Sequence, residues 1–139
     1  MPFVVDASVV LAWAPQEAHS VATAALARIE NDEAVAPSLW WFEVRNGLVV
    51  NERRGRITET ETAHFLRRIA LLSTRVVDLP DENGVLVFAR RHRLTVYDAS
   101  YLELAMREGL PLATLDGPLT SAARAEGVLL IGEADVEEA

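Results

Sequence analysis

Four acidic residues lie beside apolar segments of this sequence, where an unpaired charge is costly to bury. Two of them, Asp6 and Asp98, begin the repeated triplet Asp-Ala-Ser, in FVVDASVV and TVYDASYL. Asp116 follows the apolar run LATL, and Glu43 lies within the aromatic stretch LWWFEV. Hard oxygen ligands in that number suit Mg²⁺ or Mn²⁺, provided that the fold brings them together.

Short apolar runs alternate with helical patterns along the chain, and this alternation predicts an α/β fold. Strands are expected at residues 3–6, 34–36, 75–79, 112–115 and 128–131, and helices at 18–31, 38–54, 58–72, 82–93, 98–108 and 118–126. The pair Thr58 and Glu61 predicts a capping box at the start of one helix. Strands separated by helices favour a central parallel sheet of four to five strands with helices on both faces.

This topology determines where the four acids should lie. Ligands of open parallel sheets bind outside the carboxyl ends of the strands. Asp6 and Asp116 end predicted strands, so both belong at that edge. Helices that follow strands begin at the same edge, which adds Asp98 and Glu43. Four carboxylates at one edge repel one another and raise each other's pKa, and a divalent cation among them would relieve the repulsion.

Each acid also has a structural alternative. Asp6 and Asp98 are suited to cap the helices that follow them. Asp116 is less easily explained in this way, because Pro118 prefers the first helical position and makes Gly117 the expected cap. The alternative for Glu43 is a solvated stripe on a half-buried helix.

Three further residues are candidates for supporting roles. Ser8 lies two positions after Asp6, and Thr114 lies two positions before Asp116. Along a strand, that spacing puts Thr114 on the side of Asp116, where its hydroxyl would orient the carboxylate or a metal-bound water. Satisfying the local backbone is the alternative for such hydroxyls. Arg45 is the basic residue that we expect beside the acidic edge, where it would contact substrate.

Composition excludes several classes of protein. The 139 residues contain no cysteine, which excludes disulfides and thiolate zinc sites, and the formal net charge of −8 argues against a generally basic nucleic-acid-binding surface. No apolar run reaches the roughly 20 residues that span a bilayer, and no basic segment precedes the first apolar run. We therefore expect a single cytoplasmic domain over residues 1–139 without membrane contact, its last few residues forming a flexible acidic tail.

The acids and their contexts resemble a known family. FVVDASVVLAW, APSLWWFEVRNGL, LTVYDASYLELAMREGLPLATLD and VLLI are similar to the corresponding segments of PIN-domain ribonucleases, in particular VapC-type toxins of toxin–antitoxin pairs. The resemblance runs essentially from end to end, and the order Asp, Glu, Asp, Asp in these contexts is fairly specific to the family.

The resemblance implies a three-layer sandwich and a metal-dependent endoribonuclease. Matched by position, Asp6, Glu43, Asp98 and Asp116 would be catalytic and hold Mg²⁺ or Mn²⁺. We expect Asp6 and Asp98 to bind an ion directly, and the other two to bind a second ion or hold waters. Thr114 matches a hydroxyl position often found before the last acid. The family further implies an RNA substrate such as tRNA or ribosomal RNA, a VapB-type antitoxin that occupies a groove near the site, and a homodimer.

Two alternatives belong to other functional classes. A phosphoacceptor domain of the response-regulator type also gathers acids at the carboxyl edge of a parallel sheet, but it requires a lysine, and this chain has none. A catalytically silent PIN-fold binding module, acting through protein or RNA contacts, is the second alternative, and the presence of all four acids argues against it.

Overall fold

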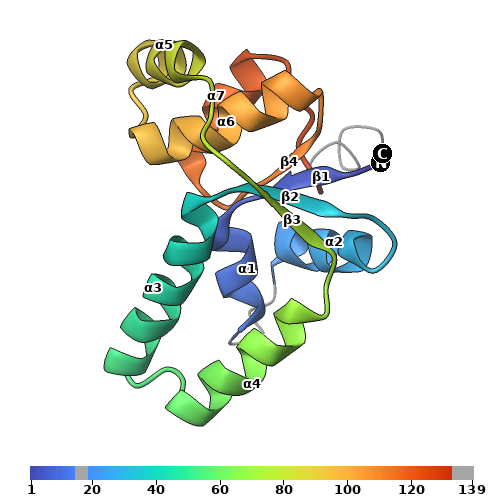
Figure 1. The fold of residues 1–139 in the computed structure, drawn as a ribbon, viewed down its shortest axis with the longest axis vertical. Helices are drawn as coiled ribbons and strands as arrows, with labels where there is room; N and C mark the ends of the chain where they lie inside the picture. The colour runs from blue at the N-terminus through green and yellow to red at the C-terminus, as the bar shows by residue number, and fades with distance from the viewer. Residues whose placement is uncertain (15–18, 133–139) are drawn as a thin grey trace.

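A four-stranded parallel sheet forms the centre of the computed structural model, which describes residues 1–14 and 19–132 (Figure 1). The strands are β1 (Phe3–Val5), β2 (Ala34–Pro37), β3 (Thr74–Val77) and β4 (Leu112–Ala113), in the spatial order β3-β2-β1-β4. All three neighbouring pairs are parallel, with Val4 opposite both Val35 and Leu112. β1 and β2 are the two inner strands, and all of their residues are buried.

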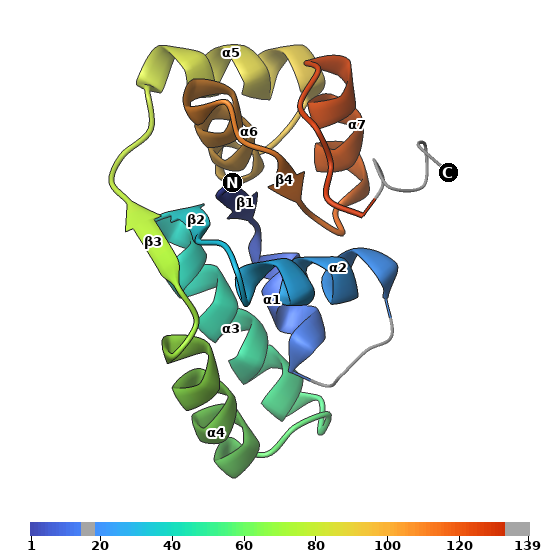
Figure 2. The same cartoon turned by 90° about the vertical axis from the view of Figure 1, so that its right-hand side faces the viewer.

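Helices cover the sheet on both faces, as the parallel topology requires. They are α1 (Ala7–Trp13), α2 (Ser20–Ile29), α3 (Leu39–Arg53), α4 (Glu59–Ala70), α5 (Glu82–His92), α6 (Val96–Glu108) and α7 (Gly117–Ala125). In both views α5, α6 and α7 lie on one side of the sheet, and α1 to α4 lie on the other (Figures 1 and 2). The predicted α/β class and three-layer arrangement are confirmed.

Helix α6 is the most deeply buried helix of the described chain. Seven consecutive residues, from 99 to 105, are buried, because α6 contacts β1 and β2 on one side and α5 and α7 on the others. A helix that is apolar on most of its circumference belongs in such an interior position. Its orientation matters for the site, because its first turn carries Asp98.

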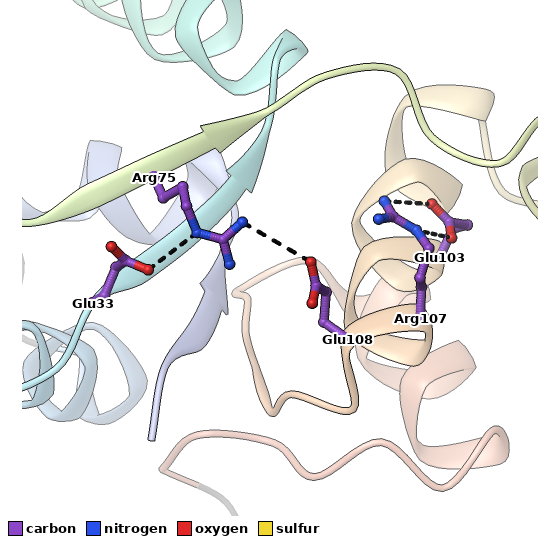
Figure 3. A network of polar contacts seen from close by, with 5 residues as sticks. All are labelled: Glu33, Arg75, Glu103, Arg107 and Glu108. Atoms are coloured by element: carbon purple, nitrogen blue, oxygen red, sulfur yellow. Dashed lines mark hydrogen bonds and ion pairs between the residues drawn. The ribbon is translucent and has the colours of Figure 1, made fainter.

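Ionic contacts hold the far end of α6 against the sheet (Figure 3). Arg75, on the edge strand β3, lies 3.1 Å from Glu33 and 4.0 Å from Glu108 in the last turn of α6. On α6 itself, Arg107 donates two hydrogen bonds, of 2.8 and 3.2 Å, to the buried carboxylate of Glu103. Exposed ion pairs contribute at most about 1 kcal/mol each, so the packing of α6 does most of the positioning.

Several element boundaries differ from the predictions, and β3 and β4 are also shorter than the strands predicted at 75–79 and 112–115. A helix was expected after Asp6 but was given no range, and it is α1. The predicted strand at 128–131 is reduced to a single parallel bridge between Leu130 and Leu112. The predicted helix at 18–31 is α2, which begins at Ser20, and residue 18 lies outside the described residues. The helix predicted from Asp98 begins earlier, at Val96. The acidic tail also lies outside the described residues.

The predicted capping box is also confirmed. Thr58 accepts a hydrogen bond from the Glu61 backbone, and the Glu61 side chain accepts one from the Thr58 backbone, each at 3.1 Å, completing the capping box of α4. No helix within the described residues is long and apolar enough to cross a membrane.

Candidate active site

Asp6 is the most buried of the four acids, with 4% of its surface exposed. It follows β1 and caps α1, where its Oδ1 accepts a hydrogen bond from the Val9 backbone N–H at 3.2 Å. The hydroxyl of Ser8 donates to the same oxygen at 2.6 Å, and the hydroxyl of Thr114 donates to Oδ2. Burial raises the pKa of Asp6 from 3.8 to about 6, because desolvation outweighs these hydrogen bonds.

The two hydroxyls tie the ends of neighbouring strands together. Thr114 donates to Asp6 and accepts a hydrogen bond from the Asp116 backbone N–H at 3.0 Å. Ser8 accepts one from the Leu115 backbone N–H at 3.0 Å. The expectation that Thr114 orients the Asp116 carboxylate is therefore not what the structure has: the hydroxyl contacts the Asp6 carboxylate and only the backbone of Asp116.

Glu43 lies in the first turns of α3 and is held by a residue that the sequence reading missed. The hydroxyl of Tyr101, on α6, donates a hydrogen bond of 2.6 Å to Glu43 Oε1. Desolvation raises the pKa of Glu43, and the nearby Asp98 raises it further, against the lowering effect of Tyr101. The available signal was the position of Tyr101, one helical turn after Asp98, where a buried tyrosine needs a partner for its hydroxyl.

Asp98 and Asp116 exchange the local roles that the sequence suggested. Thr95 caps α6, and its hydroxyl accepts a hydrogen bond from the Asp98 backbone N–H at 3.1 Å, so Asp98 lies within the first turn and is not the cap. Asp116 is itself the cap of α7, accepting from the Leu119 backbone N–H at 2.9 Å. The assignment of that cap to Gly117 was wrong, since the Asp side chain supplies the acceptor that glycine lacks.

The four carboxylates form one electrostatically coupled group. The charge of Asp116 raises the pKa of Asp6 and of Asp98, and the charge of Asp98 raises the pKa of Glu43. For Asp98, as for the other two, desolvation is the larger cause. Figure 1 shows the first turns of α3 and α6 at the same end of the sheet, where the strands finish. The predicted convergence of the acids at the carboxyl edge agrees with these couplings.

The side chains of the site are of the chemical type that binds a hard cation, but they lie too far apart to coordinate one together. All the side-chain donors are carboxylate and hydroxyl oxygens, the ligands that Mg²⁺ and Mn²⁺ prefer. Among the described residues, no three His, Asp or Glu side chains lie close enough to hold a metal ion together as they stand. Binding of an ion would therefore require the carboxylates to move closer together. Among the described residues no arginine lowers the pKa of Asp6, Glu43 or Asp98, so no side-chain cation already neutralises them.

The Arg45 side chain contacts Trp41, on its own helix, and none of the four acids. Its guanidinium lies 4.1 Å from the centre of the Trp41 ring and donates to the Trp41 backbone carbonyl at 3.2 Å. A substrate-binding role for Arg45 stays a prediction.

A cavity of about 430 Å³ lies between α1, α2 and α4. It is lined partly by Trp13 and Phe65, and none of the four acids lines it. The four acids at the sheet edge and this cavity are therefore separate features of the described chain.

Comparison with known proteins gives one consistent result. The PIN domain family matches residues 3–125, a range that includes all four acids. Ribonuclease VapC3 of Pyrobaculum aerophilum is 34% identical over 125 residues, which cover 86% of this chain and 92% of that protein. Exonuclease VapC9 of the same organism is 36% identical over 78 residues, covering 56% of this chain and 58% of that protein. The crystal structure of PAE2754, also from Pyrobaculum aerophilum, superposes with a TM-score of 0.73 at 27% identity, covering 99% of this chain and 88% of that one.

Proposed function

The chain belongs to the PIN-domain family and is a VapC-type ribonuclease, and on that premise we propose that it cleaves RNA endonucleolytically with the help of Mg²⁺ or Mn²⁺. We propose further that it is the toxin of a VapBC-type pair, that it acts in the cytoplasm, and that it forms a homodimer. Its antitoxin would be a VapB-type protein that occupies a groove near the site.

One observation carries the metal-dependent part of this proposal: the charges of Asp116 and Asp98 raise the pKa of the neighbouring acids. Asp116 acts on Asp6 and Asp98, and Asp98 acts on Glu43. A site that held only these charges would repel the phosphates of RNA. A divalent cation reverses the sign of the local potential, and so makes the same residues attractive to a polyanion.

Asp6 and Asp98 would hold an ion directly, with Glu43 and Asp116 holding a second ion or ordered waters. When bound, such an ion lowers the pKa of a coordinated water and stabilises negative charge on the phosphate oxygens. The chain itself supplies orientation. Ser8 and Thr114 hold the Asp6 carboxylate between the ends of β1 and β4, so it is already placed before any ligand arrives.

RNA outside the cleavage point would be held by arginines, because the formal net charge of −8 leaves no generally basic surface. Arg45 remains the candidate nearest to the acids in sequence. Transfer RNA and ribosomal RNA are the substrate classes that we propose to test first. Endonucleolytic cleavage has to be tested separately, because one relative is named a ribonuclease and another an exonuclease.

A circular RNA separates these activities, because it has no ends for an exonuclease. We expect the purified full chain, freed of any co-purifying antitoxin, to linearise circular RNA in the presence of Mg²⁺ or Mn²⁺. Addition of EDTA should stop cleavage, and excess Mn²⁺ should restore it. Cleavage of linear RNA alone would assign exonuclease activity and contradict the endonucleolytic part of the proposal.

The matched variants are Asp6→Asn and Asp32→Asn, which make the same chemical change at opposite edges of the sheet. Asp32 precedes β2 and pairs with the N-terminal amine at 2.8 Å, far from the strand ends that carry the acids. Asp6→Asn should abolish cleavage, whereas Asp32→Asn should retain it. Wild-type protein that binds RNA but does not cut it under any of these conditions would favour the alternative, a catalytically silent PIN-fold binding module.

A further inference from the structure

Tyr101 connects the two helices that carry Glu43 and Asp98. Its side chain is 1% exposed, and its hydroxyl donates a 2.6 Å hydrogen bond to Glu43 Oε1 on α3. Asp98 lies three residues earlier on α6, which places it one turn away on neighbouring faces of the same helix. The phenol of Tyr101 therefore connects α6, which carries Asp98, to the side chain of Glu43 on α3.

The same hydroxyl also lies close to the first acid. The charges of both Glu43 and Asp6 act on Tyr101 and favour its protonated form. Burial and the Glu43 contact raise the pKa of Tyr101 well above its usual value of 10, so the phenol is protonated and can donate at neutral pH. The buried hydroxyl thus contacts Glu43 and feels the charge of Asp6, and it belongs to the helix that carries Asp98.

Packing alone does not account for this oxygen. A phenylalanine would fill the same space, and the buried face of α3 is already provided by Trp40, Val44 and Leu48. The hydroxyl instead donates to Oε1 of Glu43, and among the described residues no hydrogen bond reaches Oε2. When one oxygen of a carboxylate is held by a hydrogen bond, the other oxygen points in a defined direction. Residues that hydrogen-bond to metal ligands commonly orient them in this way.

We propose that Tyr101 is a positioning residue for Glu43, which fixes the Glu43 carboxylate relative to Asp6 and Asp98, a role that rests on the proposed metal-dependent function. Loss of the hydroxyl leaves the ring in the core but lets the Glu43 side chain move. The consequence is weaker binding of a divalent cation at the four acids, and slower cleavage at any given metal concentration.

The chain contains two tyrosines, and the other provides a matched control. Tyr97 also lies on α6 and precedes Asp98, but its side chain is exposed. We expect Tyr101→Phe to raise the dissociation constant for Mn²⁺, measured by calorimetry on the full chain without RNA, by about tenfold or more. Tyr97→Phe removes the same oxygen and should change that constant by less than about twofold.

A double-mutant cycle distinguishes positioning from general loosening of the core. If Tyr101 acts through Glu43, adding Tyr101→Phe to Glu43→Gln should weaken Mn²⁺ binding by no more than about twofold beyond Glu43→Gln alone. Additive losses would overturn the proposal, and so would unchanged Mn²⁺ binding in Tyr101→Phe or failure of that variant to fold. Wild-type protein that binds no Mn²⁺ would overturn the metal-dependent function as well, whereas the other outcomes leave that function intact.

Discussion

The hydroxyl of Thr114 donates a hydrogen bond to the carboxylate of Asp6, a residue 108 positions earlier in the chain. The two residues follow neighbouring parallel strands, β4 and β1, and the contact closes the sheet edge between them. Thr114 also accepts a hydrogen bond from the Asp116 backbone, so one buried hydroxyl organises two of the four acids. The acidic site therefore depends on a supporting group that carries no charge.

Replacing this hydroxyl should destabilise the protein. Thr114→Val keeps the shape of the side chain but leaves the buried Asp6 carboxylate with one donor fewer and the Asp116 N–H without its acceptor. We expect the free energy of unfolding to fall by about 1 to 3 kcal/mol, measured by urea denaturation. Thr114→Ser retains the hydroxyl and should lose less. Equal losses for the two variants would mean that the methyl group matters and the hydrogen bonds do not.

Asp6→Asn should make the metal-free protein more stable. Burial raises the pKa of Asp6 from 3.8 to about 6, so the folded state disfavours the ionised form and loses stability as pH rises through this interval. At about pH 7.5 the penalty is on the order of 3 kcal/mol. A neutral amide removes this charge penalty, although it replaces one of the two accepting oxygens with a donating NH₂ group, which offsets part of the gain. We expect a gain of about 1 to 3 kcal/mol in the free energy of unfolding, together with loss of cleavage. A variant less stable than wild type would contradict this account.

Added metal should stabilise the wild-type protein selectively. Any ligand that binds only the folded state raises stability, by about 2.7 kcal/mol at 100 times its dissociation constant. We expect Mn²⁺ to raise the melting temperature of the wild-type and Asp32→Asn proteins, and to have little effect on Asp6→Asn. Thermal unfolding with and without EDTA measures this directly. The same upward shift in Asp6→Asn would place the ion away from the four acids.

A pH-dependent contribution to stability should come from the opposite side of the molecule. Glu126 accepts hydrogen bonds from His92 at 2.6 Å and from Arg91 at 2.7 Å, and these lower its pKa below 4.5. A lowered pKa means that the folded state favours the carboxylate, so the stabilisation is present above about pH 4.5 and is lost as pH falls through the lower folded-state value. Glu126→Gln should cost about 1 kcal/mol near neutral pH and almost nothing at about pH 3. A difference that stays constant with pH would contradict this origin.

Local sequence signals predicted most of the elements and the general location of the site. The alternation of apolar runs and helical patterns was sufficient for a parallel α/β sheet, and the Thr58–Glu61 capping box was identified correctly. Asp6 and Asp116 were expected at the carboxyl edge because each follows a strand. Parallel strands bring their carboxyl ends to one edge whatever the side chains are, so this part needs only the order of elements.

The tertiary structure decided which groups touch. Thr114 was assigned to Asp116 from its spacing along a strand, yet its hydroxyl reaches Asp6 because β4 lies beside β1 and the chain turns into α7. Tyr101 meets Glu43 only because α6 is buried between the sheet and two helices. Neither contact can be predicted from the spacing of residues along the sequence, because the partners are 108 and 58 positions apart. The types and order of the residues thus determined that the acids gather at one edge of the sheet. The packing of distant elements determined which neutral hydroxyls hold them, because such hydrogen bonds depend on positions that only the folded chain defines.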